Sequence, residues 1–106
     1  MGGWTALMWA CYKGHVGIVK LLIKQEADPN TQDQNHMTSL VWASGRGHTE
    51  IVHLLLEENA KVNIGDKFGT TPLIWACRKG YYKIAESLCK HGANVDASGM
   101  VSLIYF

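Results

Sequence analysis

Residues 71–76 read Thr71-Pro72-Leu73-Ile74-Trp75-Ala76, and this pattern occurs twice earlier in the chain at a constant spacing of 33 residues. Thr, Leu, Trp and Ala match in both earlier copies, which are Thr5-Ala6-Leu7-Met8-Trp9-Ala10 and Thr38-Ser39-Leu40-Val41-Trp42-Ala43. The same period continues beyond these stretches, at Gly14, Gly47 and Gly80 and at Ile18, Ile51 and Ile84. A fixed period of this length predicts a chain built from repeated structural units, with no gap between the copies.

Each copy predicts a turn followed by two short helices. In the third copy, Asp66-Lys67-Phe68-Gly69 is typical of a turn, because Gly69 can adopt a positive φ. Thr71 is a good N-cap, and Pro72 falls at the first helical position, where its missing N–H costs nothing. The first helix is predicted to end at Arg78-Lys79-Gly80, with cations in its last turn, where the helix dipole favours them.

A second helix is predicted over residues 82–91, followed by Gly92 in the left-handed conformation that commonly ends a helix. The second copy has Asn59 at this position, which tolerates that conformation, whereas the first copy has Glu26, which tolerates it poorly. We therefore expect local strain or a reshaped turn at Glu26.

A turn and two helices repeated every 33 residues are similar to the ankyrin repeat. The resemblance covers residues 3–98 and implies an all-α ankyrin-repeat solenoid. The predicted divisions are repeat 1 at residues 1–32, N-terminally incomplete, repeat 2 at 33–65, repeat 3 at 66–98, and a partial fourth repeat or truncated apolar tail at 99–106. Because no polar terminal repeat caps the stack, we expect a slice of a longer array or a truncated product. Such a chain would self-associate through uncapped apolar ends that include Leu7, Met8 and residues 103–106.

Three stretches narrow the resemblance: residues 3–15 (GWTALMWACYKGH), Gly45-Arg46-Gly47-His48 with residues 51–56, and residues 66–73. They resemble the family of ankyrin-repeat-rich membrane-spanning scaffolds, also called kinase-D-interacting substrates. That family joins a long ankyrin array to a P-loop NTPase-like region and membrane spans, and it organises signalling below neurotrophin and ephrin receptors. The resemblance implies a cytoplasmic protein-binding array at the cytosolic face of a membrane, with receptor or kinase signalling components as partners.

Charge and hydropathy argue against other classes of partner. The net charge of +1 points neither to nucleic acid nor to an anionic membrane surface. Nucleic-acid binding through Arg46, Arg78, Lys79 and Lys83 is a weaker alternative, disfavoured because repeat 2 is net acidic. No apolar run approaches the ~18 residues that cross a membrane, so no membrane span is expected.

The three cysteines do not indicate a disulfide framework. Cys11 and Cys77 occupy the same place in repeats 1 and 3, so their separation far exceeds the ~6 Å Cα spacing of a disulfide. We predict that both are packed thiols at a small buried position, and Cys89 has no partner in the sequence. The expected setting is a reducing, intracellular compartment.

Motifs for catalysis, metals and cofactors are absent from the sequence. It contains no Cys-x-x-Cys, His-Glu-x-x-His or phosphate-binding loop, and His15 and His48 lie one whole repeat apart. We therefore predict a protein that is not an enzyme and that uses no cofactor and no metal.

The strongest candidate for a functional surface is the tryptophan ladder, which consists of Trp9, Trp42 and Trp75. Residues three and four positions after each Trp share its face of the helix. With side chains from the turns, they predict a concave groove of stacked aromatics edged by cations, as enriched at protein–protein hot spots. The predicted protein-binding residues are Trp4, Trp9, Tyr12, Lys13, Asn35, Met37, Trp42, Arg46, Phe68, Trp75, Arg78 and Lys79.

Two interpretations of this surface remain open. In the first, the chain is a protein-interaction module that binds partners through its concave face and turns. In the second, it is an interior spacer, in which the indoles wedge between adjacent first helices and the cations complement helix C-termini.

Asn30 and Asn63 occupy the repeat position at which ankyrin proteins are often hydroxylated, each with a leucine eight residues upstream, Leu22 and Leu55. The alternative is that their side chains hydrogen-bond the adjoining turn.

Overall fold

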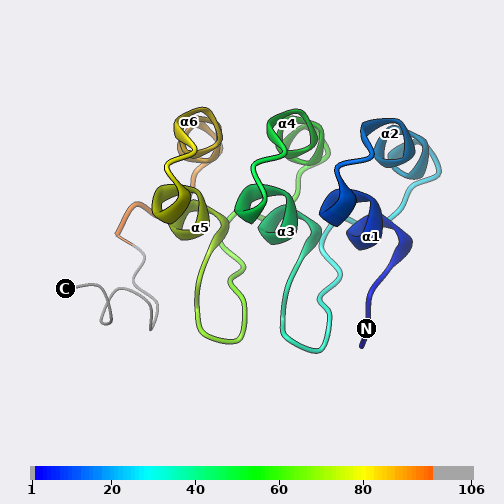
Figure 1. Cartoon of the computed structure of the whole chain (residues 1–106), viewed down its shortest axis with the longest axis horizontal. Helices are drawn as coiled ribbons and strands as arrows, with labels where there is room; N and C mark the ends of the chain where they lie inside the picture. Colours follow the sequence, from blue (N-terminus) through cyan, green and yellow to red (C-terminus); the bar gives the residue numbers. More distant parts are fainter. Residues whose placement is uncertain (1, 97–106) are drawn as a thin grey trace.

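Three helix pairs stand side by side in the computed structural model, which describes residues 2–96 (Figure 1). The first helices are α1 (Ala6–Lys13), α3 (Ser39–Gly45) and α5 (Pro72–Lys79), and the second helices are α2 (Val16–Lys24), α4 (Thr49–Glu57) and α6 (Tyr82–Lys90). Each set forms one row, and the loops from α2 to α3 and from α4 to α5 project beyond the first-helix row. We call these two loops the finger loops. The predicted all-α solenoid is confirmed, whereas the predicted segment 99–106 lies outside the described residues.

The first helices begin where the sequence predicts, at the three threonines. The hydroxyl oxygens of Thr5, Thr38 and Thr71 accept hydrogen bonds from the backbone N–H three residues later, at 3.1, 3.2 and 3.3 Å. Pro72 opens α5, and Gly80 ends it with a φ of 77°. These local signals position the three first helices in the same way.

Aspartates close the tips of the finger loops. Oδ1 of Asp33 accepts from the backbone N–H of Asn35 and Met37, and Oδ1 of Asp66 accepts from Phe68 and Thr70. The backbone N–H of Lys67 also donates to the carbonyl of Asn35 at 3.0 Å, which ties the two tips together. The predicted turn at 66–69 is therefore present, with Gly69 at φ 78°.

Left-handed backbone recurs after each second helix, as predicted. Glu26, Asn59 and Gly92 have φ values of 64°, 62° and 89°, so the turn at Glu26 is not reshaped and this residue adopts the conformation that it tolerates poorly. His36 also adopts a positive φ, of 63°, which was not predicted from the sequence; it lies at the tip of the finger loop, where the next repeat has Gly69.

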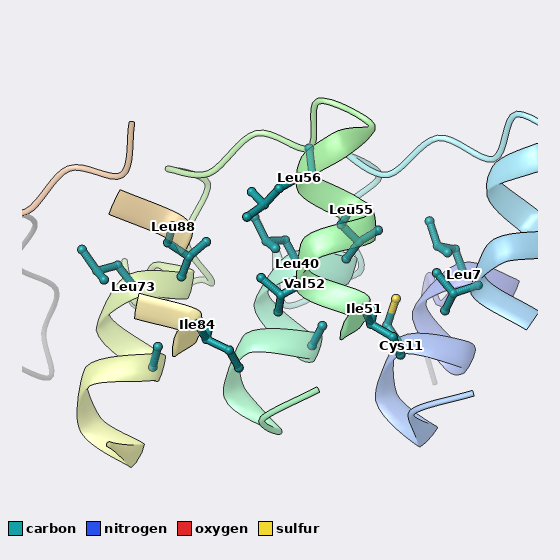
Figure 2. Packing of buried hydrophobic residues seen from close by; sticks show 14 of the residues in the cluster. Leu7, Cys11, Leu40, Ile51, Val52, Leu55, Leu56, Leu73, Ile84 and Leu88 are labelled. Carbon is teal, nitrogen blue, oxygen red and sulfur yellow. The ribbon is translucent and has the colours of Figure 1, made fainter. Parts of the chain in front are cut away.

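Core residues come from both rows of helices and form one continuous cluster (Figure 2). Leu55 of α4 is fully buried in its centre. Leu7 and Met8, expected at an exposed end, are also buried because α2 and α3 pack on α1, so this part of the self-association prediction is wrong. The exposed large apolar side chains of the first pair are instead Trp9 on α1 and Ile18 and Leu21 on α2.

The two equivalent cysteines differ. Cys11 is buried and Cys77 is exposed, so the prediction of two packed thiols is correct only for Cys11. The reason is that α3 packs on α1, whereas no helix within residues 2–96 packs on the corresponding side of α5. Burial raises the pKa of the Cys11 thiol to about 12, against a smaller opposing effect from its hydrogen bond with Ser39.

Candidate functional site

Four aromatic rings gather where α1 meets α3. Trp4 lies 4.4 Å from Trp9, 5.3 Å from Tyr12 and 4.9 Å from Trp42, measured between ring centroids. Tyr12 meets Trp42 edge-on at 5.2 Å. This group, which we call the aromatic cluster, joins side chains of two neighbouring repeats and leaves Trp9 42% exposed.

A hollow of about 180 Å³ separates Trp42 from Trp75, between α3 and α5. Gly45 of α3 lines it, at the repeat position that Tyr12 holds in α1. A Cβ atom on Gly45 would lie 3.5 Å from the Trp75 ring, so this ring packs directly on the bare helix backbone. The hollow is lined by Met37, Val41, Trp42, Gly45, Arg46, Trp75 and Lys79.

A second hollow, of about 210 Å³, adjoins the first and shares Met37 and Trp42 with it. It lies toward the finger loops and is otherwise lined by Asn35, Asp66, Lys67 and Phe68. Phe68 is 55% exposed at its edge. The two hollows form one apolar recess that crosses from the first helices to the finger tips.

Cations lie beside the rings along this surface. The guanidinium carbon of Arg46 is 4.2 Å from the centroid of Tyr12, and that of Arg78 is 4.9 Å from the centroid of Trp75. The ammonium groups of Lys13 and Lys79 lie 5.9 and 6.0 Å from Tyr12 and Trp75 respectively. Such distances permit cation–π attraction.

The tryptophan ladder is not one continuous stack, which differs from the prediction. Trp42 joins the aromatic cluster, whereas Trp75 packs on Gly45 beyond the first hollow. The indole Nε1 atoms of Trp42 and Trp75 are buried and have no hydrogen-bond partner among the described residues. These two indoles therefore offer a partner their ring surfaces and not their N–H groups.

All twelve predicted binding residues lie in these features. The aromatic cluster contains Trp4, Trp9, Tyr12 and Trp42; the hollows add Asn35, Met37, Arg46, Phe68, Trp75 and Lys79; Lys13 and Arg78 lie beside the rings. The sequence analysis missed Val41, Gly45, Asp66 and Lys67 as lining residues. The sequence does contain one sign of the hollow, because Tyr12 and Gly45 differ at the same repeat position.

Asn30 and Asn63 connect neighbouring repeats. Oδ1 of Asn30 accepts from the backbone N–H of Lys61, and Oδ1 of Asn63 accepts from Asn94, both at 2.8 Å. The prediction that these side chains hydrogen-bond an adjoining turn is confirmed.

Residues 2–96 contain no group of three His, Cys, Asp or Glu side chains placed to bind a metal ion. Within the same stretch, none of the helices has the length and hydropathy required to cross a membrane.

Helix pairs stacked in parallel, with projecting loops and an apolar recess along the first helices, define a repeat solenoid. The family model for ankyrin repeats in three copies matches residues 7–99. The chain belongs to the ankyrin-repeat family. Ankyrin repeats are generally protein–protein interaction modules and are typically non-catalytic. None of the curated proteins compared with the chain matches it.

Proposed function

We propose that the chain is a non-catalytic module that binds partner proteins through the surface formed by its first helices and finger loops. The observation that carries this proposal is the pair of adjoining hollows, which share the side chains of Met37 and Trp42 and whose lining also includes Arg46 and Lys79. Hot spots at protein interfaces combine aromatic side chains, arginine and pockets that exclude water. Specificity would come from Gly45, because the side chain missing there opens the first hollow.

A finer proposal rests on the resemblance of residues 3–15 and 66–73 to the membrane-spanning scaffold family. We infer that the module serves a larger signalling scaffold at the cytosolic face of a membrane. Its partners would then be receptor or kinase signalling components.

The alternative is an interior spacer, which one observation favours. The rings of Trp42 and Trp75 do pack on the preceding first helix, at Tyr12 and Gly45. Such packing gives the indoles a structural role, but it does not require the exposed rings of Trp9 and Phe68 or the two hollows beside them.

Photo-crosslinking in cells separates the two functions. One variant carries benzoylphenylalanine in place of Phe68, at the recess. The other carries it in place of Tyr82 on α6, a side chain that is 74% exposed. We expect protein adducts from position 68 that weaken when Arg46→Glu is added, and few from position 82. Adducts from neither position would support the spacer, whereas adducts from position 82 alone would place partner binding on the second helices and contradict the proposed surface.

A further inference from the structure

Charge is divided unequally between the two rows of helices. The first helices, counted with the residue that follows each of them, and the tips of the finger loops (residues 31–38 and 64–71) carry five of the ten basic residues but two of the nine acidic ones. The second helices and the turns that follow them (residues 25–30, 58–63 and 91–96) carry the other five basic and seven acidic residues. The surface with the hollows is therefore cationic, although the chain as a whole is almost neutral.

The two acidic residues on this side are both engaged by their own loops. Oδ1 of Asp33 and Oδ1 of Asp66 each accept two backbone N–H groups, and Asp33 is buried. Asp66 reaches the second hollow, where Lys67 lies beside it. Neither carboxylate forms an ion pair within residues 2–96.

Within residues 2–96, the three cations that line the hollows, Arg46, Lys67 and Lys79, have no carboxylate paired with them. The one ion pair within residues 2–96 joins Lys20 of α2 to Glu50 of α4, in the other row. Arg46 and Lys79 line the first hollow and Lys67 the second, and none of the three forms an ion pair in the described part of the chain. Their aromatic neighbours hold them beside the hollows and leave their charge for a partner.

The size of the hollows determines which side chains a partner can place in them. An apolar cavity of roughly 150 Å³ holds a benzene-sized group. Each hollow is somewhat larger than this, and together they have room for two apolar side chains. Because both share Met37 and Trp42, the two side chains would come from one short segment.

We propose that the recess recognises an acidic peptide segment, which places apolar side chains in the two hollows and carboxylates beside Arg46, Lys67 and Lys79. The inference rests on the proposed function and names its partner chemistry. Complementary charge favours this segment over a neutral one, mainly by steering the encounter and excluding basic competitors.

Selection of phage-displayed random peptides on the chain tests the inference. We expect the selected peptides to be net acidic and to contain large apolar residues. The double variant R46E/K79E should lower their affinity at least about tenfold. K83E/K90E makes the same change of charge on exposed positions of α6 and should leave affinity unchanged. The thermal midpoint of K83E/K90E should stay close to that of the original chain, because exposed charges contribute little to folding. That of R46E/K79E should fall by no more than the loss of the contact between Arg46 and Tyr12 accounts for.

A second pair of variants tests the hollow itself. Gly45→Leu places a side chain in the first hollow and should lower the affinity of the selected peptides about tenfold. Gly17→Leu is the matched control, because a Cβ atom there meets nothing within 4 Å.

The outcomes separate the inference from the proposed function. Neutral or basic peptides that lose binding in Gly45→Leu would overturn the acidic partner and leave the binding function standing. Oligo-dT that competes with the selected peptides and loses binding in R46E/K79E would overturn the peptide in favour of nucleic acid. If the selected peptides bind every variant with unchanged affinity, or if no peptides are selected at all, the recess is not a binding site.

Discussion

The guanidinium of Arg46 lies over the ring of Tyr12, 4.2 Å from its centroid, across the contact between α1 and α3. The same ring meets Trp42 edge-on at 5.2 Å. One residue near the end of α1 thus contacts both a cation and an indole of the next repeat. Between the second and third repeats, Gly45 holds the position of Tyr12 and has no side chain to make such contacts.

A double-mutant cycle measures this contact. Tyr12→Leu and Arg46→Gln should show a coupling free energy of about 0.5–1 kcal/mol, since the pair is partly exposed to solvent. Urea denaturation of the four proteins supplies the four free energies of unfolding. A coupling of zero within error would show that Arg46 does not stabilise the repeat contact.

Leu55→Ala should destabilise the chain by about 2–5 kcal/mol, because its side chain is fully buried in the central second helix. Small domains have little stability to spare, so we expect loss of the folded circular-dichroism spectrum. Leu21→Ala is the matched control: Leu21 is 56% exposed on α2, and its change should stay within about 0.5 kcal/mol. A folded Leu55→Ala variant with an unchanged midpoint would contradict this account of the core.

Glu26→Gly should stabilise the chain by about 1 kcal/mol, because it removes the steric cost of a left-handed residue with a Cβ atom. Glu58→Gly is the control. Glu58 comes directly before Asn59, the left-handed residue of repeat 2, and its own φ is −92°, so glycine removes no steric cost there. Thermal and urea unfolding of both variants provide the comparison. Equal effects of the two substitutions would show that the strain at Glu26 is negligible.

Trp42→Phe should cost about 1 kcal/mol or less in stability. The loss of ring contact with Trp4 and Tyr12 is offset because the variant no longer buries an indole N–H without a partner. Partner affinity should fall, since the ring area that lines both hollows is reduced. If the thermal midpoint falls while affinity is unchanged in this variant and in R46E/K79E, the spacer is the correct function.

Cys11 should resist alkylation in the folded chain, whereas the exposed Cys77 and Cys89 should react. Its pKa of about 12 lies above the ordinary value of 9.0, so between these pH values the folded state binds more protons than the unfolded state. Stability should therefore fall as pH rises through this window, and Cys11→Ala should reduce that dependence. Mass spectrometry of the labelled chain and urea unfolding at rising pH check both statements.

Local features of the fold were predictable from the sequence, since they depend on neighbours along the chain. The threonine caps, the turn at 66–69 and the left-handed position of Glu26 follow from residues close in sequence. The exposure of Cys77 was not predictable from its match with Cys11, because burial there depends on the repeat that packs against it.

The candidate site was also only partly predictable from the sequence. Its twelve residues follow from the repeat pattern, but the pattern does not predict that they divide into an aromatic cluster and two hollows. That division depends on which side chain the preceding repeat presents to each tryptophan: Tyr12 faces Trp42, and Gly45 faces Trp75. A periodic match treats these positions as equivalent, whereas the packing depends on their difference.

The helices of this stack pack mainly on their own pair and on the next one, so contacts join residues close in sequence. Low contact order allows fast folding, because little loop-closure entropy is lost before contacts form. The central pair packs on both neighbours and is the expected nucleus, from which structure spreads in both directions. Destabilising substitutions in α3 and α4 should accordingly slow folding, while those in α1 and α2 should mainly accelerate unfolding.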